Sequence, residues 1–164
     1  MNAPAHQHRV ARPPRILLVA SGGGHWVQLS RTFLAFRDFD VACVTTIDGY
    51  EDALGRRFGS VRYYRVTNSS RESMWGLIRT GWQLARILLR ERPDWVISTG
   101  AAPGYLALRL GRLAGARTLW LDSAANHGRL SLSGLKVRPY ADVWLTQWPH
   151  LRAADGPRFE GRVF

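Results

Sequence analysis

Residues 16–25 read ILLVASGGGH, an apolar run that ends in three consecutive glycines and a histidine. In α/β proteins, a buried strand that turns through glycines into a helix lets backbone N–H groups approach a phosphate or a sugar. His25 adds a group that transfers protons near neutral pH. Three glycines exceed what a structural turn needs, so the motif predicts a ligand surface made by Gly22, Gly23 and Gly24. His25 has two other possible roles: it caps the helix, or it is an ordinary surface residue.

Strand and helix patterns alternate along the chain after a flexible basic arm at residues 1–14. The expected strands are residues 15–21, 40–46, 61–66, 94–98, 117–122 and 141–146. The expected helices are residues 26–36, 50–58, 71–92, 103–114 and 132–138. Right-handed crossovers then predict an α/β fold, a Rossmann-like parallel sheet in the order 3-2-1-4-5-6 with helices on both faces. We expect residues 15–164 to form one such domain, without the second wall that a ligand crevice of this fold usually needs.

Composition supports a globular domain. The chain has 164 residues, of which 46% are hydrophobic. Cys43 is the only cysteine and lies in an apolar stretch, so we expect a buried thiol, no internal disulfide and a cytoplasmic protein. No apolar run approaches the roughly 20 residues that cross a bilayer, so we expect a soluble or peripheral protein.

The formal net charge is +11, and 22 of the 23 basic residues are arginine. The planar guanidinium suits phosphate, so anionic partners are expected: a membrane surface, a diphosphate ligand or a nucleic acid. A high genomic GC content would produce the same arginine bias. The nucleic-acid alternative rests on charge alone, since no recognised nucleic-acid motif accompanies it, and we expect no nucleic-acid partner.

The glycine loop differs from a dinucleotide-binding fingerprint. The third glycine of that fingerprint would fall at Val27, and the second strand ends in Thr45 and Thr46 without the carboxylate that holds a ribose. We therefore expect no nicotinamide cofactor. Residues 38–40 (DFD) resemble a metal-binding D-x-D, but they precede the second strand and lie at the wrong edge of the sheet. No metal site is predicted.

A second small-residue loop, residues 98–104 (STGAAPG), follows the fourth strand. In the expected order this strand neighbours the first at the topological switch point, where crevices open at the carboxyl ends of strands. We expect Ser98, Thr99, Gly100 and Ala101 to line a ligand there, and Pro103 to occupy the first helical position.

A third loop, residues 122–127, follows the fifth strand at the same edge. Asp122 has three alternatives: it orients a sugar hydroxyl, holds His25, or caps the following turn. Asn126 is a weaker candidate for substrate binding.

Two further surfaces are candidates for membrane or partner contact. The helix at 71–92 carries Arg79, Arg86 and Arg90 beside an apolar surface that includes Trp75 and Trp82. Tryptophan beside arginine suits a helix on anionic lipid, and the alternative is a crossover helix that touches a partner. In the C-terminal segment, Trp148 and Phe164 are expected interface anchors, although ordinary packing under the sheet is an alternative for Trp148.

Five motifs in this order resemble the PssD/CpsF-type polysaccharide-biosynthesis proteins. These are bacterial relatives of the membrane-side subunit of the eukaryotic dolichol-diphosphate GlcNAc transferase. The motifs are residues 16–29 (ILLVASGGGHWVQL), 98–104 (STGAAPG), 121–126 (LDSAAN), 130–134 (LSLSG) and 141–149 (ADVWLTQWP). The resemblance runs from about residue 15 to the C-terminus, although relatives often have an acidic or valine-containing stretch where this chain has residues 126–129 (NHGR).

The resemblance implies the N-terminal, acceptor-side half of a split, inverting GT-B glycosyltransferase, which forms a heterodimer with a separately encoded donor-side subunit. The implied donor is a UDP-sugar held mainly by that partner, with no other cofactor. The implied acceptor is a polyprenyl-diphosphate-linked sugar at the inner face of the cytoplasmic membrane, in exopolysaccharide or capsule biosynthesis. His25 is our hypothesis for the general base. The alternative is a non-catalytic subunit that docks a glycosyltransferase on the membrane and activates it.

Overall fold

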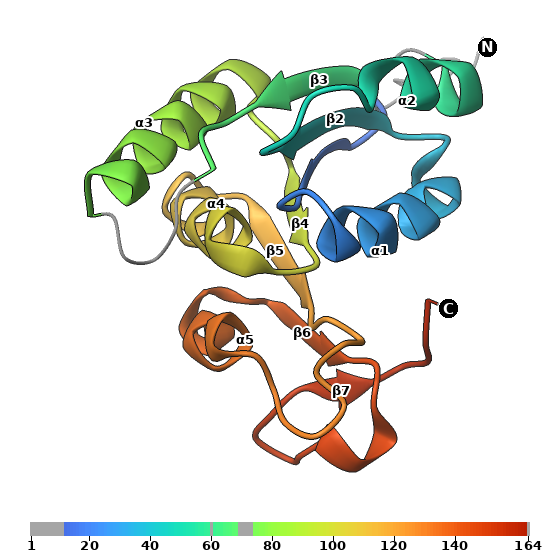
Figure 1. Ribbon diagram of the computed structural model, residues 1–164, viewed down its shortest axis with the longest axis vertical. Helices are drawn as coiled ribbons and strands as arrows, with labels where there is room; N and C mark the ends of the chain where they lie inside the picture. Colours follow the sequence, from blue (N-terminus) through green and yellow to red (C-terminus); the bar gives the residue numbers. More distant parts are fainter. Residues whose placement is uncertain (1–11, 60, 69–73, 164) are drawn as a thin grey trace, which may run out of the picture.

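The structure, a computed structural model, describes residues 12–59, 61–68 and 74–163. Seven strands of this part form one parallel sheet in the order β3-β2-β1-β4-β5-β6-β7 (Figure 1). They are β1 (Arg15–Val19), β2 (Asp40–Thr45), β3 (Arg62–Arg65), β4 (Trp95–Ser98), β5 (Arg117–Leu121), β6 (Val143–Thr146) and β7 (Arg158–Phe159). The predicted order of six strands is confirmed. The seventh strand was not predicted, because two residues are too few to give a sequence pattern.

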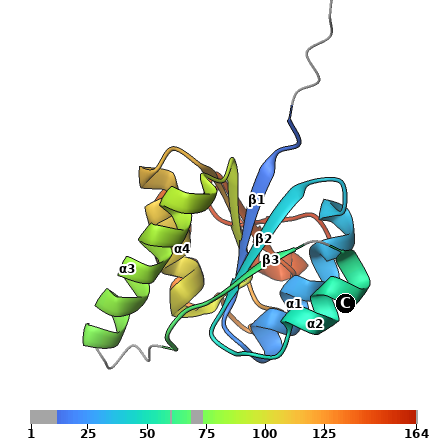
Figure 2. The same cartoon turned by 90° about the horizontal axis from the view of Figure 1, so that it is seen from above.

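Helices cover both faces of the sheet (Figure 2). They are α1 (Gly24–Thr32), α2 (Glu51–Phe58), α3 (Met74–Glu91), α4 (Ala101–Leu113) and α5 (Leu132–Val137), with 3-10 turns at Phe33–Phe36, Arg138–Tyr140 and Pro149–Leu151. One core cluster packs Trp26, Leu29 and Phe33 against the α1 side of the sheet, where Cys43 is buried as expected. The other packs α3, α4 and α5 against the opposite side.

Helix α4 begins two residues before the predicted start, with Gly100 as its N-cap. Pro103 is therefore the third helical residue and not the first, as predicted. The helix tolerates it there because the first four N–H groups of a helix have no intrahelical acceptor, so a missing donor costs no hydrogen bond. Most of the predicted arm and the predicted start of the helix at 71–92 lie outside the described residues.

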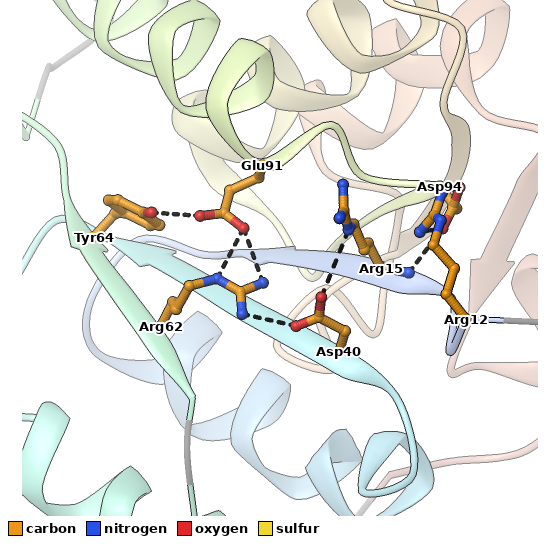
Figure 3. A network of polar contacts seen from close by, with 7 residues as sticks. All are labelled: Arg12, Arg15, Asp40, Arg62, Tyr64, Glu91 and Asp94. Carbon is orange, nitrogen blue, oxygen red and sulfur yellow. Dashed lines mark hydrogen bonds and ion pairs between the residues drawn. The ribbon is translucent and has the colours of Figure 1, made fainter.

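At the amino edge of the sheet, charged side chains of alternating sign join β1, β2, β3 and the residue before β4 to the end of α3 (Figure 3). The Glu91 side chain is 7% exposed, accepts two hydrogen-bond contacts from Arg62 at 2.9 Å, and also accepts from the Tyr64 hydroxyl. Arg62 donates in turn to Asp40 at 2.7 Å. The hydrogen bond to Glu91 raises the pKa of the Arg62 guanidinium. This network stabilises the edge opposite the glycine loops.

Replacing Glu91 by glutamine is expected to lower the free energy of unfolding by about 2 kcal/mol, because Arg62 loses its buried counter-charge. Urea denaturation near neutral pH measures this difference. The matched control is Glu160→Gln at an exposed position, for which we expect less than about 0.5 kcal/mol. Equal effects of the two substitutions would show that the Glu91 network does not stabilise the fold.

Asp94 lies at one end of this network, and its ionisation makes the stability of the fold depend on pH in the acidic range. The backbone N–H of Arg15 and the guanidinium of Arg12 donate to its carboxylate and lower its pKa. The ionised carboxylate is therefore favoured by folding, and its contribution to stability is lost as the pH falls through the lowered pKa. Asp94→Asn is expected to lower the urea midpoint near neutral pH, with a difference from wild type that narrows below about pH 4. If the difference in urea midpoint between Asp94→Asn and wild type stays the same at every pH, the ionised Asp94 carboxylate is not its cause.

Candidate functional site

The loops after β1 and β4 are held together at the carboxyl edge of the sheet by a reciprocal pair of hydrogen bonds. The ring Nδ1 of His25 lies 3.1 Å from the carbonyl oxygen of Thr99. The Thr99 hydroxyl donates to the carbonyl oxygen of His25 at 2.8 Å. Strands β1 and β4 pair directly, as predicted, so the two small-residue loops meet at the switch point.

This contact selects one tautomer of the neutral His25 ring. A carbonyl oxygen only accepts hydrogen bonds, so Nδ1 carries the hydrogen and donates it to Thr99. Nε2 then has a free lone pair and is the atom that can accept a proton. The half-buried ring is thus fixed in the tautomer that a general base needs.

Gly100 is needed for the position of this ring. A Cβ atom at Gly100 would lie 2.4 Å from both Cε1 and Nδ1 of His25, closer than real Cβ contacts. The residue also has φ +144, which an L-residue with a side chain rarely adopts. Its neighbour Ala101 has φ +64, a left-handed conformation that costs an alanine on the order of 1 kcal/mol. Gly100 therefore makes room for His25, and a ligand along its backbone stays a prediction.

The three glycines of the first loop have different surroundings. Gly22 donates its N–H to the Thr46 hydroxyl at 3.0 Å, and a Cβ atom there would overlap Ile47. Gly23 and Gly24 are exposed, and nothing lies within 4 Å of a Cβ atom built on either. Gly22 thus packs against the loop after β2, while the other two leave their backbone open to an approaching molecule.

Ser98 and Asp122 are buried supports of their loops. The Ser98 hydroxyl accepts from the Gly100 N–H at 3.2 Å. The Asp122 carboxylate, in a residue 1% exposed, accepts from the Trp120 indole and from both the N–H and the hydroxyl of Ser131. Ser131 is the N-cap of α5, so Asp122 acts through that cap. Of the three alternatives for Asp122, the contact with His25 is not made, since the ring is held by Thr99.

Two buried glutamines that the sequence reasoning missed brace the neighbouring loops. Gln28 of α1 accepts from the Ala124 N–H at 3.1 Å. Gln147 donates to the Asp122 carbonyl at 3.0 Å and accepts from the Val163 N–H at 3.1 Å. A polar residue on the apolar face of α1 was the only sequence signal for Gln28. The loop after β5 is thus fixed between α1 and the C-terminal segment.

Trp148 packs against the loop after β5 rather than under the sheet. Its indole N–H donates to the Ala124 carbonyl at 2.9 Å, and the Arg162 guanidinium lies 4.4 Å from the centre of the ring. In the same loop, Asn126 is half-buried and donates its N–H to the Ser123 carbonyl at 3.0 Å. Phe164, the other predicted anchor, lies outside the described residues.

The outer surface of α3 combines exposed apolar and basic side chains. Trp75 is 81% exposed and Trp82 60%, and Met74, Ile78 and Leu89 are exposed too. Arg86 lies over the Trp82 ring at 4.6 Å. Arg79, Arg86 and Arg90 are exposed beside them. We define these residues as the α3 surface. Among the described residues, no helix is both long and apolar enough to cross a membrane.

The chain is related to one glycosyltransferase subunit by sequence. It is 33% identical over 81 residues to the UDP-N-acetylglucosamine transferase subunit ALG14 of Yarrowia lipolytica, an alignment that covers 46% of this chain and 37% of that protein. The matched segment is thus little more than a third of the relative's length. No protein-family model matches the chain.

Solved structures show that the fold is that of the Rossmann-like N-terminal half of GT-B glycosyltransferases. MurG of Acinetobacter baumannii superposes with a TM-score of 0.71 at 16% identity, over 90% of this chain and 45% of that one. The UDP-N-acetylglucosamine 2-epimerase of Rickettsia bellii superposes with a TM-score of 0.68 at 13% identity. This alignment covers 93% of this chain and 46% of the epimerase chain. This chain therefore spans about half the length of each.

Proposed function

We propose that this chain is the acceptor-side subunit of a split, inverting GT-B glycosyltransferase of the PssD/CpsF type. In this proposal a separately encoded subunit holds most of a UDP-sugar donor, and the two form a heterodimer. The acceptor is a polyprenyl-diphosphate-linked sugar at the inner face of the cytoplasmic membrane, in exopolysaccharide or capsule biosynthesis. The half-length GT-B fold and the relative named as a transferase subunit support this assignment.

The observation that carries the proposal is the hydrogen bond from His25 Nδ1 to Thr99, which leaves Nε2 as the proton acceptor. In the proposed reaction Nε2 takes the proton of the acceptor hydroxyl while that oxygen forms a bond to the anomeric carbon of the donor. The bond from this carbon to UDP breaks on the opposite face, and UDP leaves with the electron pair. Proton removal of this kind contributes about 10²–10⁴-fold to the rate.

The backbone around His25 supports a role in binding the acceptor. Helices α1 and α4 both begin at this edge, and helix N-termini present free N–H groups and partial positive charge. In the proposal, the N–H groups of Gly23, Gly24 and Ala101 contact the diphosphate or the first sugar. The +11 net charge favours such an anionic acceptor.

Co-expression with the protein encoded by the adjacent reading frame tests this function. The expected results are a complex that co-purifies and transfer of labelled sugar from a UDP-sugar to the membrane lipid fraction only when both subunits are present. Transfer by this chain alone would contradict a split enzyme.

The α3 surface favours the second candidate function, a non-catalytic docking and activating subunit. In that case the partner alone should transfer sugar to an acceptor solubilised in detergent, because docking is then no longer needed. We expect instead that the partner alone is inactive in detergent, since it lacks His25.

A further inference from the structure

A cavity of about 210 Å³ lies between α3, α4 and α5. Its walls are mostly apolar, and none of its lining side chains carries a carboxylate. The lining residues are Leu77, Ala102, Tyr105, Leu106, Ser133 and Lys136. Lys136 is exposed, and it is the only lysine of the chain.

The cavity lies at the same edge of the sheet as His25. Each lining residue belongs to the first two turns of its helix, and these three helices all begin after the carboxyl ends of strands. Figure 1 shows the three helices stacked along one face of the sheet. Ala102 is the second residue of α4 and follows closely on Gly100, which packs against the His25 ring. One end of the cavity is therefore next to the proposed reaction site.

Exposed apolar side chains also occur on the two helices that line the cavity beside α4. Ile78, next to the lining residue Leu77, is 55% exposed. On α5, Leu132 and Leu135 flank the lining residues Ser133 and Lys136 and are 62% and 55% exposed. Helices α3 and α5 thus each contribute both to the cavity wall and to the exposed apolar surface.

We propose that this cavity binds the hydrocarbon tail of the lipid-linked acceptor, in the part nearest its diphosphate, and that Lys136 pairs with the diphosphate. This inference rests on the proposed function. A single ammonium group at an apolar cavity without carboxylates matches a molecule with an anionic head and an apolar tail. A hollow of about 210 Å³ between three helices admits one chain, whereas the exposed side chains of the α3 surface suit a bilayer face. The tail therefore sets the orientation of the acceptor toward His25.

Calorimetric titration of the full chain with farnesyl diphosphate and with isopentenyl diphosphate tests the proposal. The two probes share a head group and differ in tail length. We expect farnesyl diphosphate to bind at least about tenfold more tightly, because its longer tail buries more apolar surface. Leu106→Trp, which fills the cavity, should remove this preference and leave isopentenyl diphosphate binding unchanged. Lys136→Gln should weaken both probes by a similar factor of about five, since it removes a charge near the head group.

The matched control is Leu113→Trp, the same substitution at a residue of α4 that is 77% exposed and does not line the cavity. It should keep the preference for the longer tail. If Leu106→Trp unfolds the protein, Ala102→Leu replaces it as the test. Ala102 is a half-exposed lining residue, and this substitution should also remove the preference for the longer tail.

A preference for the longer tail that survives Leu106→Trp or Ala102→Leu in folded protein would overturn the cavity proposal alone. Absence of binding for both probes, together with absence of transfer by the complex, would overturn the acceptor assignment as well. If the two probes bind equally and the complex still transfers sugar, only the proposal that the cavity binds the tail would be overturned.

Discussion

Replacing Gly100 by alanine is expected to lower sugar transfer by the assembled complex at least about 100-fold, because a displacement of about 1 Å at a catalytic group has effects of this size. The new Cβ atom would lie 2.4 Å from two atoms of the His25 ring, so the ring must leave its position against Thr99. The measurement is the transfer rate at saturating substrate, with co-purification of the partner as a check that the complex still forms.

Gly115→Ala is the matched control for this substitution. Gly115 also has a positive φ, +84, but nothing lies within 4 Å of a Cβ atom built there. Both variants therefore carry backbone strain, on the order of 1 kcal/mol, and only Gly100→Ala collides with His25. Similar transfer rates for the two variants would mean that the position of the His25 ring is unimportant.

Replacing both Trp75 and Trp82 by serine is expected to weaken binding to vesicles of phosphatidylglycerol and phosphatidylcholine at least about tenfold. These are the two largest exposed apolar side chains of the α3 surface, and arginines flank them. Sedimentation of the full chain with vesicles measures the change. Binding of the wild-type chain should also fall with added salt, because exposed arginines attract anionic lipid and salt screens that attraction.

The control is Leu113→Ser, which removes an equally exposed apolar side chain outside the α3 surface. Vesicle binding should not change in this variant. If the double tryptophan variant binds vesicles as wild type does, the α3 surface contacts a protein partner instead, the alternative left open by its sequence.

Alternating apolar and amphipathic segments predicted most of the fold, because right-handed crossovers leave few possible strand orders. The errors have local causes. Proline is commonest at the first helical position, so Pro103 predicted a start of α4 at that residue. The helix can begin at Ala101 because a proline fits anywhere in the first turn. Strand β7 is formed only because residues 158–159 pair with β6, a contact that short segments do not encode locally.

The meeting of the two small-residue loops was predictable from the sequence, but the contacts inside the site were not. The partner of His25 is a backbone carbonyl, and every residue has one, so no residue pattern marks it. Asp122 looked equally suited to a histidine, a sugar or a cap, and only the tertiary structure brings Ser131 to it. Gln83 of α3 accepts from the Thr67 N–H at 2.8 Å, a contact with a loop that no local pattern marks. Polar side chains reveal their roles only once their neighbours are known.

The transfer rate of the His25→Ala complex tests the central claim most directly. With the partner, a UDP-sugar and the lipid acceptor present, we predict a rate at least about 100-fold below wild type, because the general base is removed. Co-purification and vesicle binding should be unchanged, since His25 lies on neither the α3 surface nor the C-terminal segment. A rate above about a tenth of wild type would contradict the assignment of His25 as the base and place the chemistry in the partner subunit.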